Sequence, residues 1–196
     1  MANRNTQGFG LIAQGTVGST PATGGQGKYL IDAGMGVDLF QGTAVRSAAG
    51  YIVTAQAAIT NTCIGVLNGI FYNDATTKKP TFANFYNQPI TPANSEDITA
   101  FVIDNPNQLF VASIDTAAAQ AEYGKTYGLT VTAAGSDLSG QSSSELTYAT
   151  RHATNNQWRL VRTAEDPENN DIAAANCSVV VAHNLNQYFT GAVTWQ

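Results

Sequence analysis

The chain has 196 residues, of which only 12% are charged, and its formal net charge at pH 7 is -5. Soluble domains usually carry about 25% charged residues, and here Ala, Thr, Gly, Asn, Ser and Gln take their place. The Lys and Arg residues are scattered along the chain, whereas nucleic-acid binding requires a basic stripe that neutralises phosphates. We therefore predict no nucleic-acid partner. A surface with few charges favours a protein packed among identical neighbours, where unpaired charges are costly to desolvate.

Residues 1–27 are predicted to form an extended N-terminal arm. Its apolar cluster contains Phe9, Leu11 and Ile12, and the stretch 15–27 is rich in Gly and polar residues, which bury too little surface to offset the entropy of ordering. We expect the arm to order against another molecule; the alternative is a frayed terminus whose Phe9 packs on its own domain. The sequence shows no signal-peptide pattern and no apolar run of about 18 residues, so we predict neither secretion nor a membrane partner.

From residue 28 to residue 196 the pattern predicts a single β-rich domain. Short runs of β-branched and aromatic residues alternate with turn residues, which indicates an antiparallel β-barrel or sandwich and a mainly β fold. Gly65 and Gly69 interrupt one apolar run and suggest bulges that curve the sheet. The expected strands are 28–32, 43–46, 51–54, 63–72, 98–103, 108–114, 127–132, 158–162 and 178–183.

Two pairs of these strands are predicted to form hairpins. The strands 43–46 and 51–54 flank a short connection that contains Gly. The strands 98–103 and 108–114 flank Asp-Asn-Pro-Asn, in which Pro106 suits the second position of a type I turn.

One short helix is expected among these strands, over residues 117–123. Asp115 or Thr116 can cap its N-terminus and Gly124 can terminate it. The segments 135–144 and 164–170 are rich in Ser, Gly, Asp and Asn, and we expect both to be loops.

The sequence offers few residues for catalysis or metal binding. Cys63 and Cys177 each lie in an apolar segment and are interpreted as small buried core residues, although whether they pair in a disulfide stays open. His152 and His183 belong to no nucleophile motif, and their spacing to the cysteines matches no common zinc pattern. We predict no enzymatic activity, no metal and no cofactor.

An acidic segment at 165–171 provides oxygen-rich side chains, but it lacks the alternating spacing and the central Gly of a calcium loop. A solvated loop is the better interpretation. The Gly-rich stretches at 8–10 and 24–27 do not open onto a helix, as a phosphate-binding loop requires.

Large apolar side chains also occur near the C-terminus. Tyr188, Phe189 and Trp195 are candidate oligomer contacts, in the same way that Phe9, Leu11 and Ile12 are candidate contacts with a partner protein. The alternative is that the C-terminal segment forms the last core strand. An exposed Trp158 or Trp195 would instead suit a glycan-binding module, in which the ring stacks on a sugar.

The order of segments resembles the head decoration ("cement") proteins of tailed phages that infect marine and freshwater bacteria. The similarity spans most of the chain and rests on structural segments rather than on a catalytic fingerprint. The segments that carry it are 3–11, 18–23, 100–110, 158–162, 166–170 and 184–188.

The resemblance implies a structural virion protein that is made in the bacterial cytoplasm and lies on the capsid exterior. Its partner would be the phage major capsid protein, whose subunits it would clamp across their seams. A homo-oligomer is implied, with a trimer favoured over a dimer or monomer. The alternative is another virion component, such as a tail, neck or fibre-associated subunit.

Overall fold

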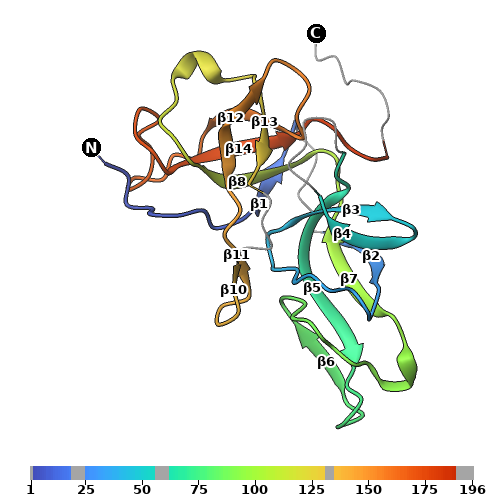
Figure 1. The fold of residues 1–196 in the computed structure, drawn as a ribbon. Coiled ribbons are helices and arrows are strands. Elements are labelled where there is room, and N and C mark those ends of the chain that lie inside the picture. The colour runs from blue at the N-terminus through green and yellow to red at the C-terminus, as the bar shows by residue number, and fades with distance from the viewer. Residues whose placement is uncertain (1, 19–24, 56–61, 131–134, 189–196) are drawn as a thin grey trace.

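The computed structural model describes residues 2–18, 25–55, 62–130 and 135–188 of the chain. It is mainly β, with 47% of residues in strands and 4% in helical turns, so the mainly β part of the predicted fold class is confirmed. Figure 1 shows a barrel at one end and a second sheet that extends away from it.

The barrel is built from strands that come mostly from the C-terminal half of the chain. Its strands hydrogen-bond in the order β8-β14-β13-β9-β12, and a parallel bridge between Leu146 and Ile114 returns the sheet to β8. Within the described residues this closes a five-stranded barrel, one of the two predicted architectures. The strands are β8 (Gln108–Ile114), β9 (Thr126–Leu129), β12 (Leu146–His152), β13 (Trp158–Thr163) and β14 (Cys177–His183).

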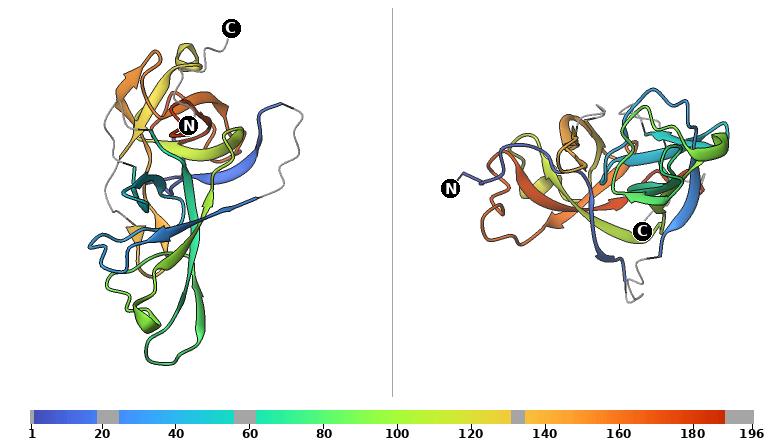
Figure 2. Two further views of the ribbon diagram at one scale, coloured as in Figure 1. Left: turned by 90° about the vertical axis from the view of Figure 1, so that its right-hand side faces the viewer. Right: turned by 90° about the horizontal axis from the view of Figure 1, so that it is seen from below.

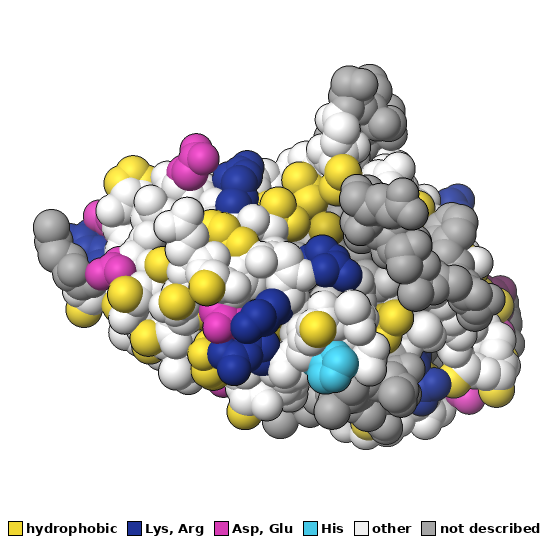
Figure 3. Space-filling view, turned by 90° about the horizontal axis from the view of Figure 1, so that it is seen from above, with side chains coloured by type: hydrophobic (Ala, Val, Ile, Leu, Met, Phe, Trp, Pro, Cys, Tyr) yellow, Lys and Arg dark blue, Asp and Glu magenta, His cyan; other side chains and the backbone are white. Residues whose placement is uncertain are grey.

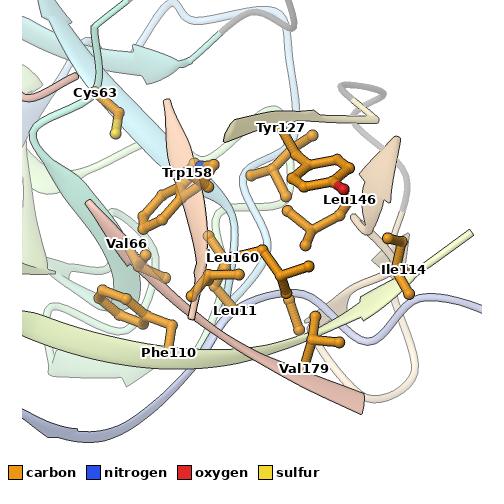
Figure 4. Close-up of a cluster of buried hydrophobic side chains, with 14 of the residues drawn as sticks. Leu11, Cys63, Val66, Phe110, Ile114, Tyr127, Leu146, Trp158, Leu160 and Val179 are labelled. Carbon is orange, nitrogen blue, oxygen red and sulfur yellow. The ribbon is translucent and has the colours of Figure 1, made fainter. Parts of the chain in front are cut away.

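Hydrophobic side chains fill the barrel because the strands direct alternate residues inward. Trp158, Phe110 and Tyr127 are fully buried, and the ring of Phe110 meets the ring of Trp158 edge-on at a centroid distance of 5.4 Å. Figure 4 shows these rings packed with Leu11 and Leu160. Every residue of β14 is buried, so this strand is covered on both faces.

The second sheet has its own core. Its strands run in the order β2-β7-β5-β3-β4, and β6 pairs with the far end of β5. Figure 2 shows that β5 and β7 carry this sheet away from the barrel. Its buried side chains include Ile31, Leu39, Ile52 and Ile98. The strands are β2 (Gly27–Ile31), β3 (Ala44–Ala48), β4 (Tyr51–Thr54), β5 (Gly65–Asn73), β6 (Pro80–Ala83) and β7 (Ile98–Ile103), and a small ribbon of β10 (Gly135–Ser136) and β11 (Gln141–Ser142) lies beside them.

Backbone and side-chain contacts join the barrel to the second sheet. Cys63 lies just before β5 and Val66 lies near its start, yet both side chains pack in the barrel core rather than in the core of the second sheet. The backbone N–H of Cys63 donates to the carbonyl of Leu185 at 3.2 Å, and that of Gln187 donates to the carbonyl of Cys63 at 2.9 Å. The side-chain amide of Gln187 also bonds both the N–H and the carbonyl of Ser47. The two cores are therefore held together by directional bonds.

One predicted hairpin is confirmed and the other is wrong. β3 and β4 pair through a tight turn at Ala49 and Gly50, whose φ angles are 51° and 88°. The predicted hairpin of 98–103 and 108–114 has the correct strand bounds, but β7 and β8 lie in different sheets. The reason is that the inward residues of β7 pack in the second core, whereas those of β8 pack in the barrel core. The turn between them therefore passes the chain from one sheet to the other.

The predicted helix at 117–123 is not confirmed. The segment forms a single 3₁₀ turn, η2 (Gln120–Glu122), and another such turn, η1 (Ala93–Ser95), lies elsewhere. The N–H of Ala118 donates to Ile172 and that of Gly124 donates to Leu160, both at 2.8 Å. Long-range partners thus take the hydrogen bonds at both ends of a segment that is too short to be helical alone.

The predicted extended arm at 1–27 is not confirmed either. Residues Ile12–Thr16 form β1, which pairs antiparallel with β8, and Leu11 packs in the barrel core with 3% of its surface exposed. This segment can detach as an arm only if β1 separates from β8 and Leu11 leaves the barrel core.

Replacement of Gly65 by Ala is expected to destabilise the fold by about 1–3 kcal/mol or more. A Cβ at Gly65 would lie 2.2 Å from the carbonyl oxygen of Ile103, which is backbone and cannot move aside cheaply. Chemical denaturation measures the loss. Gly15→Ala is the matched control, since nothing lies within 4 Å of its added Cβ. Equal stabilities for the two variants would contradict the close approach of β5 and β7.

Candidate functional site

The N-terminal segment is fastened to the outside of the barrel at the loop that precedes β14. The side-chain amide of Asn3 donates to the carbonyls of Asp171 and Ala175, each at 2.9 Å. The backbone N–H of Asn5 donates to the side-chain oxygen of Asn169 at 2.7 Å. The acidic segment predicted to be a solvated loop is indeed irregular, and it also supplies the acceptors that hold the N-terminal segment.

The candidate contact residues of this segment differ in exposure. Ile12 has 51% of its surface exposed, Phe9 is half-buried, and Leu11 is in the core. The N–H of Leu11 donates to the carbonyl of Gly42 at 2.9 Å, and its side chain packs in the barrel core. Ile12 and part of Phe9 are thus accessible at the surface, whereas Leu11 is not.

β1 is an edge strand. It bonds β8 along one side and pairs with no other strand among the described residues. Ile12, Ala13 and Gln14 are all exposed. An edge strand offers unpaired N–H and C=O groups that an extended segment of another chain can complete.

Of the candidate oligomer contacts, the structure places Tyr188; Phe189 and Trp195 lie outside the described residues. Tyr188 has 54% of its surface exposed, and its hydroxyl bonds that of Tyr29. Tyr29 in turn donates to the carboxylate of Asp104 at 2.8 Å. Burial and these bonds raise the pKa of Tyr29 above its usual value of 10.0. Tyr188 is thus held in place while part of its ring remains free for contact.

The buried tryptophan removes one candidate for sugar stacking. Trp158 is 0% exposed, so it cannot stack on a ligand. The other candidate, Trp195, lies outside the described residues.

Cys63 and Cys177 are both free and buried, which confirms their interpretation as core residues. Burial raises the pKa of the Cys63 thiol to about 12 and that of the Cys177 thiol to about 11. The Sγ of Cys63 lies 3.5 Å from the Nδ1 of His183, and burial lowers the pKa of this imidazole to about 4. A protonated thiol beside a neutral imidazole is not a reactive thiolate–imidazolium pair.

In the described part of the chain, no group of three or more His, Cys, Asp or Glu side chains is arranged to hold a metal ion. His152 is exposed, and its Nδ1 accepts from the backbone N–H of Thr154 and Asn155 at 3.2 Å. No helix among the described residues has the length and apolar character needed to span a membrane. The predicted absence of an enzyme, a metal and a cofactor stays a prediction.

Sequence reasoning missed a cluster of three phenylalanines on the second sheet. Phe71 and Phe82 face each other across β5 and β6, with ring centroids 4.7 Å apart. Phe101, on β7, lies 6.3 Å from Phe82. β6 and β7 alternate in burial and β5 does not, and the strand register that brings the three rings together on one face is not visible in the sequence. Phe82 has 73% of its surface exposed.

The rest of the surface carries few charges. The face shown in Figure 3 is mostly neutral, with Lys and Arg side chains in small separate groups. No protein-family model, curated protein or solved structure matched the chain. The geometry of the described residues therefore carries the functional argument.

Proposed function

We propose that this chain is a capsid decoration protein of a tailed phage, which lies on the capsid exterior and binds the major capsid protein across subunit seams. It acts without catalysis, cofactor, nucleic acid or membrane. The observation that carries the proposal is the exposed edge of β1 with Ile12 on it. The low charge and the resemblance of the segment order to decoration proteins support it.

The edge of β1 suits a contact with an extended segment of a capsid subunit. Main-chain bonds to an edge strand supply affinity, and an apolar side chain such as Ile12 supplies a pocket-filling contact. Full burial of an exposed isoleucine side chain contributes about 1.5–3 kcal/mol, and Ile12 has 51% of its surface left to bury. A single such contact is weak, but repetition over a shell adds avidity, particularly where each copy belongs to an oligomer.

We propose a homo-oligomer, with a trimer favoured, in which Tyr188 and the following Phe189 and Trp195 contribute to the contact between copies. The support is the half-exposed ring of Tyr188, which its bond to Tyr29 holds in one orientation. An anchored aromatic ring loses little conformational entropy when it is buried in an interface.

Ile12→Asp is expected to weaken capsid binding by about tenfold or more, because a carboxylate replaces an apolar side chain that the contact would bury. Co-sedimentation of the purified variant with capsids that lack the protein measures the effect. Val161→Asp is the matched control, since Val161 is also partly exposed, at 40%, but lies on β13. Wild-type capsid binding by a folded Ile12→Asp protein would contradict the role of β1.

A further inference from the structure

A cleft opens on the second sheet where β5, β6 and β7 meet. It encloses about 330 Å³ and is lined by Phe82, Phe101 and Gly69. The two rings are nearly parallel, with an angle of 21° between their planes and centroids 6.3 Å apart. Gly69 lies opposite Phe101 in the strand register, so no side chain fills the floor beside that ring. The cleft is thus an apolar platform that faces solvent.

Amide side chains form the rim of this cleft. Asn68 and Asn84 line it together with Gln26. The Nδ2 of Asn84 donates to the carbonyl of Ser139 at 2.8 Å, and the Oδ1 of Asn68 accepts from Gln41 at 3.0 Å. These bonds orient both amides. They leave the Oδ1 of Asn84 to accept from a ligand and the Nδ2 of Asn68 to donate to it.

The cleft continues toward the N-terminal segment. Asn68 also lines a neighbouring cavity of about 260 Å³, whose wall includes Phe9 and Gln141. Phe9 and Gln141 in turn line a third cavity of about 340 Å³, where the other side chains are mostly those of serines in the β10–β11 region. Shared lining residues make the three cavities neighbours, and together we call them the groove; Phe82 and Phe101 line its first cavity and Phe9 lines the other two.

The groove has no charge of its own. Among the described residues that line its three cavities, none is Asp, Glu, Lys, Arg or His. A phosphate or nucleic-acid ligand requires cationic or clustered N–H donors, and an acidic or basic peptide requires an opposite charge. The polar groups that are present are neutral amides and hydroxyls, each able to donate and to accept.

We propose that this groove binds a neutral oligosaccharide. The C–H faces of sugar rings pack on the exposed rings of Phe82 and Phe101, and the sugar hydroxyls bond the oriented amides of Asn68 and Asn84. A chain of sugar units follows the groove toward Phe9. The stacking rings Phe82 and Phe101 lie on β6 and β7, whereas the proposed capsid contact is the edge of β1. Ile12 also lines the middle cavity, so the two proposed sites adjoin there.

The test is binding of the full-length protein to an array of oligosaccharides that includes neutral gluco-, manno-, galacto- and N-acetylated oligomers and sialylated or sulfated ones. We expect retention on neutral oligomers. Titration calorimetry with the best neutral oligomer then compares three proteins. Phe82→Ala is expected to weaken binding by about tenfold or more, in line with the loss of one stacking contact, whereas Val161→Ala, at a partly exposed site on β13, leaves it unchanged.

Three results would overturn the proposal. One is no retention on any neutral oligomer, another is retention on charged oligomers alone, and the third is neutral-oligomer binding that Phe82→Ala leaves intact. Capsid co-sedimentation of Phe82→Ala separates this site from the proposed function. If Phe82→Ala loses capsid binding and the wild type binds no oligosaccharide on the array, the ligand of the groove is a capsid polypeptide instead.

Discussion

Replacement of Trp158 by Ala is expected to lower the free energy of unfolding by about 3–5 kcal/mol. The indole is fully buried in the barrel, edge-on to Phe110 and 4.4 Å from the ring centroid of His183. Its Nε1 has no hydrogen-bond partner among the described residues, so the loss arises from packing rather than from a broken polar bond. A cavity of this size between β8, β13 and β14 cannot close without movement of all three strands.

Urea denaturation monitored by far-UV circular dichroism measures this effect. Val161→Ala is the control on the same strand, and a change within about 0.5 kcal/mol is expected because its side chain is partly exposed. Trp158→Phe should lose less than Trp158→Ala, since a smaller ring still fills part of the space. A Trp158→Ala protein as stable as the wild type would show that the barrel is not packed around this residue.

Acidification from pH 6.5 to pH 4 is expected to remove about 3 kcal/mol of stability through His183 alone. The imidazole is buried among Phe110, Trp158 and Cys63, and this burial lowers its pKa from 6.5 to about 4. Above pH 6.5 the residue is neutral in both the folded and the unfolded chain. Below pH 6.5 the imidazole is protonated in the unfolded chain but stays neutral in the folded chain. The free energy of unfolding therefore falls as the pH falls toward 4.

The difference between the wild type and His183→Gln isolates this contribution, because other groups titrate nearby. Burial raises the pKa of the Glu145 carboxyl, which has the opposite sign and favours the folded state in mild acid. Hydrogen bonds lower the pKa values of Asp74 and Asp166, whose effects appear below pH 3.8. Unfolding free energies measured at several pH values for both proteins are compared. Parallel pH profiles would contradict a neutral buried His183.

The strands could be predicted because their signals are local, whereas their partners could not. The alternating pattern at 98–103 and 108–114 gave the bounds of β7 and β8. The turn at Pro106 then suggested a hairpin, since adjacent strands usually pair. Which core each strand joins depends on contacts with β2, β5 and β14, which are distant in the sequence. Long-range packing therefore determines which strands β7 and β8 pair with, and the turn motif between them carries no information about that packing.

The same limit applies to the candidate site. The cluster of Phe9, Leu11 and Ile12 was recognised by composition, but the chain direction that buries Leu11 and exposes Ile12 follows from the pairing of β1 with β8. The aromatic cleft depends on the register that places Phe71 opposite Phe82 and Gly69 opposite Phe101. The residue types predicted that an interaction surface exists. Which side chains are exposed on it, and which lie side by side, depends on the strand register.

Cryo-electron microscopy of the intact virion at side-chain resolution tests the proposed function most directly. The proposal predicts density for the barrel and the second sheet in many copies over the head, with β1 and Ile12 against a seam between major capsid subunits. Density confined to the tail, the neck or the fibres would contradict it and would make the chain a component of that structure instead.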